Sequence, residues 1–267
     1  MDLQSVLLLL GAGVVTGFLA GLFGVGGGII LVPILVFYFQ SIGVSSLVAT
    51  HITFGTSLLI IVFTSASSAH QYWRNGHVVW KAVLWIGLSS VIGAWVGSWV
   101  AAGLQGKQLQ QIFSVVVVVA ALRILIPLRK PDGQTQANTG LPGLIGAGTF
   151  VGGVSSLAGV GGGVFSIPLM YSLLRFPLKK ALGTSSAAIV LTALAASVGY
   201  IVRGMGNPLL PDHSLGYVAY LHALPVIAGS LPMARVGAAV AHKTDVGILR
   251  KIFGVFLFVV AAKMFFL

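Results

Sequence analysis

The sequence has no glutamate, no cysteine and only four aspartates among its 267 residues. Charged residues make up 7% of the chain, against about 25% in ordinary soluble domains, so a soluble globule of this size would lack a charged surface. Hydrophobic residues make up 57%, and the mean hydropathy is +1.03. The composition therefore predicts an all-α polytopic membrane protein that lies almost entirely in the lipid bilayer.

The missing side chains also exclude several kinds of chemistry. Without cysteine there are no disulfides, thiolate nucleophiles or zinc-thiolate sites. Asp2, Asp132, Asp212 and Asp245 all lie at segment ends or in loops, so a proton or sodium relay built on a buried carboxylate is excluded. The histidines do not have the spacing of a metal site. No cofactor is expected, and any ion coupling would use histidine or backbone carbonyl groups.

The 15 lysines and arginines give a net charge of +11. They stand singly or in pairs between apolar runs and do not form the basic stripe that a nucleic-acid-binding surface needs. No nucleic acid partner is expected. The positive-inside rule of membrane proteins explains these residues better.

About 20 apolar residues span the hydrocarbon core as one helix, and the chain contains ten apolar segments. They are expected at about residues 3–22, 29–40, 46–70, 82–104, 108–127, 142–158, 164–174, 181–203, 216–241 and 248–266.

An internal repeat organises these segments. The run Gly24-Val-Gly-Gly-Gly28 with Pro33 recurs 135 positions later as Gly159-Val-Gly-Gly-Gly163 with Pro168. Three further pairs follow in the same order: Ala49-Thr50 with Gly183-Thr184, Val96-Gly97 with Val236-Gly237, and Ile112-Phe113 with Ile252-Phe253. We interpret the chain as a duplication with repeats at residues 1–128 and 140–267, joined by a polar cytoplasmic linker at 129–139.

Five segments in each repeat would invert the second relative to the first. If the N-terminus is outside, eleven basic residues fall on the inner side and only Lys107, Arg203 and Lys263 on the outer side. That bias predicts a multi-pass membrane protein with a cytoplasmic central loop. The expected location is the plasma (inner) membrane of a prokaryote. The bias persists if the first two segments of each repeat form a re-entrant pair. Inverted repeats are typical of secondary transporters.

The two glycine runs are the first candidate substrate site. Four glycines in five residues disfavour a continuous helix, and unwound backbone at membrane depth is tolerated where it lines a cavity. The helix that follows would direct N–H groups and its positive dipole end at an anion. This assigns substrate contact to Gly26, Gly27, Gly28, Gly161, Gly162 and Gly163; tight helix packing is the alternative.

With these features the chain resembles the TauE/SafE sulfite exporter family, part of the group of toluene sulfonate uptake permeases. The resemblance covers both halves and rests on the doubled glycine motif, its following Pro, and the Ala-Thr or Gly-Thr-Ser about 16 residues on. It implies a transporter of small sulfur-containing anions such as sulfite, thiosulfate or organosulfonates. Thr50-His51 departs from Thr184-Ser185, so the expected hydroxyl set is asymmetric.

Hydroxyl groups suit a sulfur oxyanion because they donate hydrogen bonds without a fixed charge. Thr50, His51, Thr184, Ser185 and Ser186 are therefore candidate substrate ligands, with helix capping or intrahelical bonding as the alternative for the hydroxyls. His51 is included because it takes the place of Ser185 in the repeat.

Arg235 is the remaining candidate ligand. It lies eight residues before Lys243, or about 12 Å along a helix, and a charge inside the membrane indicates function by default. Snorkelling of its side chain to the inner surface is the alternative.

Alternating-access export of the anion at a site between the repeats is the expected function, since an inside-negative potential drives an anion outward. An anion channel and an uptake permease are the alternatives. An intramembrane hydrolase is disfavoured because its motifs are absent, and a structural scaffold is disfavoured by Arg235 and the paired glycine runs. Whether the protein forms a homodimer is left open.

Overall fold

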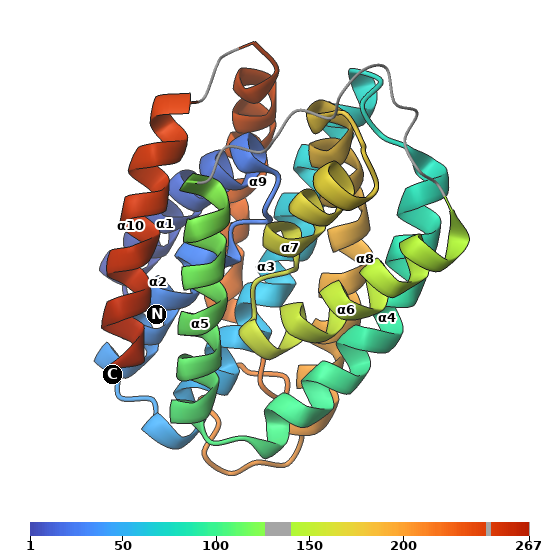
Figure 1. Ribbon diagram of the computed structural model, residues 1–267. Helices are drawn as coiled ribbons and strands as arrows, with labels where there is room; N and C mark the ends of the chain where they lie inside the picture. The colour runs from blue at the N-terminus through green and yellow to red at the C-terminus, as the bar shows by residue number, and fades with distance from the viewer. Residues whose placement is uncertain (126–139, 244–246, 267) are drawn as a thin grey trace.

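The computed structural model describes residues 1–125, 140–243 and 247–266, and shows a bundle of helices (Figure 1). The regular structure in these ranges is helical, apart from an isolated bridge between Leu215 and Val218. The predicted linker 129–139 lies outside the described residues. The prediction of an all-α fold is confirmed.

The helices follow the order of the predicted segments. They are α1 Leu3–Phe23, α2 Gly28–Ser41, α3 Ser46–Arg74, α4 Trp80–Gly103, α5 Gly106–Leu125, α6 Leu141–Ala158, α7 Gly163–Pro168, the π-helix η1 Leu169–Leu173, α8 Leu178–Gly204, α9 Tyr220–Lys243 and α10 Gly247–Phe265.

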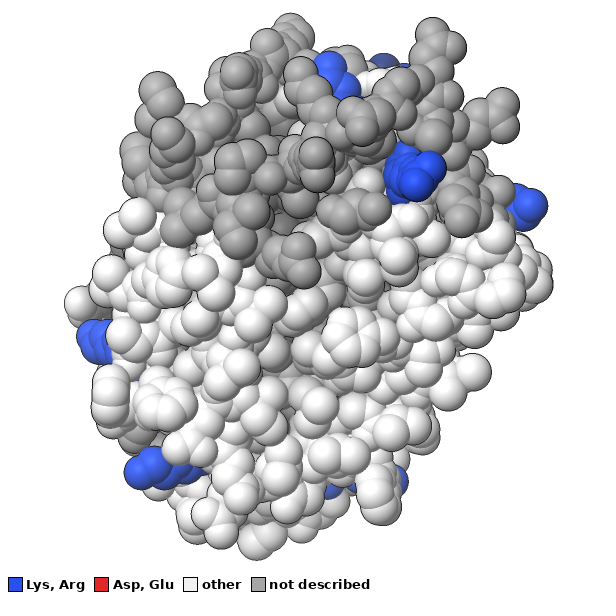
Figure 2. Space-filling view, in the orientation of Figure 1, with Lys and Arg blue, Asp and Glu red and all other residues white. Residues whose placement is uncertain are grey.

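Six of the described helices are long and apolar enough to cross a membrane: α1, α3, α4, α6, α8 and α9. Helices α2 and α5 are shorter apolar helices. Figure 2 shows a broad belt of uncharged residues on one face, with most of its described Lys and Arg toward the two ends and no Asp or Glu in view. The structure is that of an integral membrane protein with many spans.

Helices α6 and α7 form a hairpin within the bundle. Figure 1 shows α7 turning back from the glycine run toward the end of the molecule at which α6 begins. The chain therefore enters α8 from the end at which it entered α6.

The first helix of each half packs along the fourth helix of the other half: α1 on α9, and α6 on α4. Glycines make this contact close. A Cβ atom built at Gly17 would lie 2.5 Å from the Cα of Ser230, and one at Gly152 would lie 2.8 Å from the carbonyl carbon of Ser90. Small residues let helix backbones approach in a membrane, where apolar side chains gain little from leaving lipid.

Helices α3 and α8 pack against each other at the core and are mostly buried. Each holds the first helix of one half, α1 or α6, through a fully buried tyrosine. The Tyr72 hydroxyl donates to the carbonyl of Gly21 at 3.0 Å, and the Tyr200 hydroxyl donates to the carbonyl of Ser156 at 3.0 Å. These bonds fix α1 on α3 and α6 on α8, and so position the glycine run at the end of α1 and of α6.

Candidate functional site

Both glycine runs are turns that interrupt a helix, as predicted. The C-cap residue of α1 is Gly24, with φ 66°, and the C-cap residue of α6 is Gly159, with φ 64°. Gly26 and Gly27 have φ values of 79° and 86°. Gly161 and Gly162 have φ values of 81° and 94°. Residues with a side chain rarely adopt this left-handed backbone conformation, so these positions favour glycine.

The two turns contact each other, although 135 positions separate them in the sequence. A Cβ atom built at Gly28 would lie 2.7 Å from the Cα of Val160 and 2.9 Å from the carbonyl oxygen of Gly159. Conversely, a Cβ atom built at Gly163 would lie 2.7 Å from the carbonyl oxygen of Gly24. The backbones of the two turns therefore cross with no side chain between them at these positions.

A helix begins at this crossing in each half. Gly27 is the N-cap of α2, and its carbonyl accepts from the N–H groups of Ile30 and Leu31. Because Gly27 has no side chain, it cannot cap the first N–H groups of the helix. Helix N-termini carry partial positive charge and favour anions. The 14-residue helix α2 thus directs a positive end into the centre of the molecule.

Two buried serines lie beside the turns, and the sequence reasoning missed both. Ser65 Oγ would lie 3.2 Å from a Cβ atom built at Gly26. Ser155 Oγ would likewise be in contact with a Cβ atom built at Gly162. Both side chains are at most 1% exposed, and neither hydroxyl has a hydrogen-bond partner among the described residues. Buried hydroxyls normally find a partner, so these two are available to a bound ligand. Ser155 stands one helical turn before Gly159, a spacing that the sequence could have signalled.

The predicted match between Thr50-His51 and Thr184-Ser185 is wrong. Thr184 Oγ1 accepts from the N–H of Val79 at 3.0 Å, just before α4. The residue with the same contact in the first half is Thr56, whose Oγ1 accepts from the N–H of Ala219 at 2.9 Å, just before α9.

The tripeptides Gly55-Thr56-Ser57 and Gly183-Thr184-Ser185 are therefore counterparts, 128 positions apart. The chain between the glycine run and the tripeptide is longer in the first half than in the second. Counting a constant distance from the glycine runs therefore matched Thr184 with Thr50, although its counterpart is Thr56. The hydroxyl set has both Thr-Ser pairs, and the expected asymmetry is absent.

The two serines of these tripeptides contact the hairpin of α6 and α7. Ser57 Oγ donates to the carbonyl of Gly159 at 2.7 Å, which ties α3 to the second glycine turn. Ser185 Oγ bonds Ser166 Oγ of α7. Ser185, one of the predicted ligands, thus lies beside α7. Its counterpart Ser57, which contacts the second glycine turn, was not among the predicted ligands.

Other predicted hydroxyl ligands serve the packing of the bundle. Thr50 Oγ1 accepts from Gln110 Nε2 of α5 at 3.0 Å, and the Ser186 hydroxyl donates within α8 to Leu182 at 3.0 Å. His51 Nε2 donates to the carbonyl of Leu104 at 3.1 Å, and its ring lies 5.0 Å from that of Tyr217. Thr184 holds the start of α4. No cluster of three or more potential metal ligands occurs among the described residues.

Arg235 lies on α9 with an exposed side chain. Its Nε donates to Ser67 Oγ of α3 at 3.2 Å, and Ser67 in turn donates to the carbonyl of Leu231 at 2.6 Å. The guanidinium is therefore held at the periphery of the helix bundle, beside the contact between α3 and α9.

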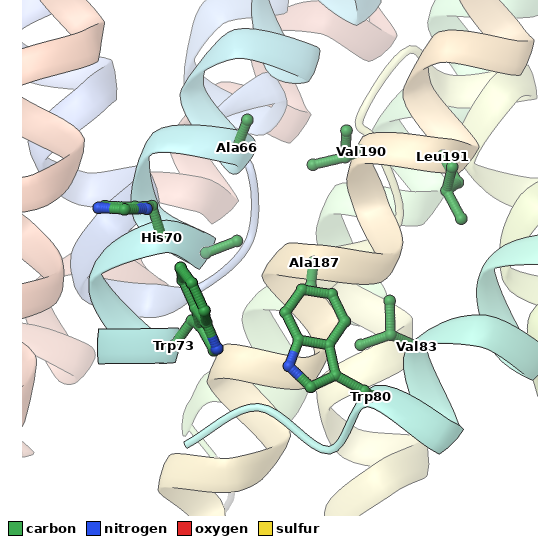
Figure 3. A pocket seen from close by; sticks show the side chains of 9 residues that line it. Ala66, His70, Trp73, Trp80, Val83, Ala187, Val190 and Leu191 are labelled. Atoms are coloured by element: carbon green, nitrogen blue, oxygen red, sulfur yellow. The ribbon is translucent and has the colours of Figure 1, made fainter. Parts of the chain in front are cut away.

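An open groove of about 360 Å³ lies between α3, α4 and α8 (Figure 3). The rings of Trp73 and Trp80 meet edge to face at one end, 6.3 Å apart, and His70 lies 5.8 Å from Trp73. The remaining lining residues are apolar: Ala66, Ala69, Val83, Ala187, Val190 and Leu191. The lining of the groove is mostly apolar, so it offers an anion fewer hydrogen-bond donors than the crossing of the turns, where Ser65, Ser155 and the start of α2 lie.

The chain is similar along nearly its whole length to proteins from several prokaryotes. A probable membrane transporter protein of Haemophilus influenzae is 35% identical over 260 residues, which cover 97% of this chain and 98% of the relative. Probable membrane transporter proteins of Methanocaldococcus jannaschii and Bacillus subtilis are each 26% identical, covering 93% and 98% of this chain and 92% and 98% of the relatives. No solved structure matches the chain.

The family described as sulfite exporter TauE/SafE matches residues 9–264. The match spans both glycine turns and all the helices that surround their crossing. Together with the membrane-spanning helices and the relatives, it shows that the chain belongs to the TauE/SafE family of membrane transporters.

Proposed function

We propose that the protein moves a small sulfur-containing anion, such as sulfite, thiosulfate or an organosulfonate, across the membrane by alternating access at the crossing of the two glycine turns. The observation that carries this proposal is the backbone contact between the turns, to which Gly28 and Gly163 each contribute. Broken helices that meet at a repeat interface are where secondary transporters bind their substrates.

The groups at the crossing match the chemistry of a sulfur oxyanion. Such an anion accepts several hydrogen bonds, and the free N–H groups at the start of α2 can donate to it. The unpartnered hydroxyls of Ser65 and Ser155 add one donor beside each turn. Each described aspartate lies outside the helices, so no fixed negative charge opposes the ligand in the described helices.

Matched contacts in the two halves support the proposal of inverted repeats. Thr64 Oγ1 bonds Ser230 Oγ at 2.9 Å between α3 and α9. Thr192 Oγ1 bonds Ser90 Oγ at 2.6 Å between α8 and α4. Both bonds join the third helix of one half to the fourth helix of the other. With the N-terminus outside, the two halves would present opposite ends to the cytoplasm, as rocking around a central site requires.

Arg235 is proposed as an electrostatic guide toward the site. From α9, its Nε donates to Ser67 Oγ of α3, and Ser67 lies two residues after Ser65 in the sequence. A positive charge near a path of low dielectric raises the local concentration of anions.

Export is the proposed direction. An inside-negative potential contributes about 2.3 kcal/mol per charge per 100 mV to outward movement of an anion. This drive requires no buried carboxylate, and the described helices contain none.

The proposal is tested with purified protein in liposomes loaded with radiolabelled sulfite. We expect saturable efflux, acceleration by unlabelled sulfite on the opposite side, and a rate that increases when the interior is made negative. Linear flux without counterflow would favour the channel alternative. Equal flux in protein-free liposomes would overturn the proposed function.

A further inference from the structure

Two isoleucines lie where the glycine turns cross. A Cβ atom built at Gly26 would lie 3.0 Å from Ile61 Cγ2 and 3.6 Å from Ile189 Cγ2. A Cβ atom built at Gly161 would lie 2.7 Å and 3.3 Å from the same two methyl groups. Each isoleucine therefore contacts both turns, and the pair occupies one small region at the centre of the molecule.

The pair is matched in the two halves. Ile61 lies on α3 and Ile189 on α8, 128 positions apart, the same separation as the tripeptides Gly55-Thr56-Ser57 and Gly183-Thr184-Ser185. Their side chains are 0% and 1% exposed. Two equivalent side chains that meet at the centre of the molecule are well placed to narrow a path that runs between the two halves.

The constriction is apolar, whereas the groups on either side of it are polar. Ser65 follows Ile61 by one helical turn and its hydroxyl approaches Gly26. Ser57 precedes Ile61 by one helical turn and bonds the carbonyl of Gly159. A narrow ring of apolar side chains excludes water and hydrated ions from a pore. Methyl groups at this point would therefore hold an anion on one side until the helices move apart.

We propose that Ile61 and Ile189 form the central constriction of the transport path and limit the size of the anion that passes. This proposal rests on the proposed function, because it assigns the isoleucines to the path of the anion. Each isoleucine is a specificity residue here, since neither carries a group that would bind the anion.

The first test compares anions of different size in liposomes. Ile61→Ala/Ile189→Ala should raise the flux of benzenesulfonate relative to sulfite by about tenfold or more, and Ile61→Val/Ile189→Val should give a smaller rise. Ile60→Ala is the matched control, because Ile60 neighbours Ile61 and is also buried, at 1% exposure. An unchanged ratio in folded alanine and valine variants would overturn the constriction.

The second test needs no transported substrate, because the chain has no cysteine of its own. Ser65→Cys places one thiol beside Gly26, and its reaction with a membrane-impermeant thiol reagent is timed. The rate should rise about tenfold when Ile61→Ala/Ile189→Ala is added, but not when Ile60→Ala is added. Equal rates in all three proteins would overturn the proposal. Faster labelling in the alanine variant, with no sulfite flux in the protein that keeps Ser65, would keep the constriction and reject the proposed substrate.

Discussion

At the scale of single residues, the glycine turns tolerate no side chain because of what they touch. Gly28→Ala would push a methyl group against the backbone of Val160, and overpacking of this kind costs about 1–3 kcal/mol. We expect a lower unfolding midpoint and at least a tenfold loss of anion flux. Gly146→Ala is the control, since a Cβ atom there meets nothing within 4 Å. A Gly28→Ala protein as stable and active as Gly146→Ala would contradict the close crossing.

The charge of Arg235 can be separated from its packing because the side chain is exposed. Arg235→Gln keeps most of the side-chain volume but removes the charge. If Arg235 guides the anion, kcat/KM for sulfite should fall about tenfold, equivalent to about 1.4 kcal/mol. Arg203→Gln is the control, because Arg203 lies over the Trp99 ring at the end of α8. Equal transport by both variants would remove Arg235 from the mechanism.

At the scale of helices, two buried tyrosines make equivalent bonds to α1 and α6. Tyr72→Phe and Tyr200→Phe each remove one hydroxyl that donates to a helix carbonyl. Each loss should lower the free energy of unfolding by about 1 kcal/mol, as measured by denaturation in mixed micelles. Tyr220→Phe, at an exposed position, should change it by less than about 0.5 kcal/mol. A cost for one buried tyrosine alone would contradict equivalent roles in the two halves.

The helices also show where sequence patterns succeed and fail. Hydropathy located the helices because each needs a long apolar run, and the glycine runs located two breaks because only glycine adopts those turns readily. The predicted segment 216–241 begins before α9, which starts at Tyr220. Residues such as Tyr217 are apolar but lie in the loop that packs on Gly55. Hydropathy does not distinguish a buried loop from a buried helix.

At the scale of the whole molecule, the orientation in the membrane can be tested with single cysteines in a chain that has none. Asn75 follows α3, and Leu209 lies between α8 and α9. With the N-terminus outside, Asn75→Cys should react with an impermeant reagent only from the cytoplasmic side, and Leu209→Cys only from the outer side. The parent protein should not react at all. The reverse pattern would invert the proposed topology.

The sequence by itself determined the class of the protein, the positions of its breaks and the chemistry that its interior excludes. These follow from hydropathy, from the backbone needs of glycine and from residue types that are missing, and none of them depends on a distant contact. The tertiary structure decided that the turns touch, that Ser65 and Ser155 face them, and that Arg235 is exposed. It also showed that the residue equivalent to Thr184 in the first half is Thr56 and not Thr50. Ile61 and Ile189 lie close together at the crossing of the turns. The contact of the turns, the match of Thr184 with Thr56 and the meeting of Ile61 with Ile189 depend on how helices more than 100 positions apart pack against each other, which local spacing does not encode.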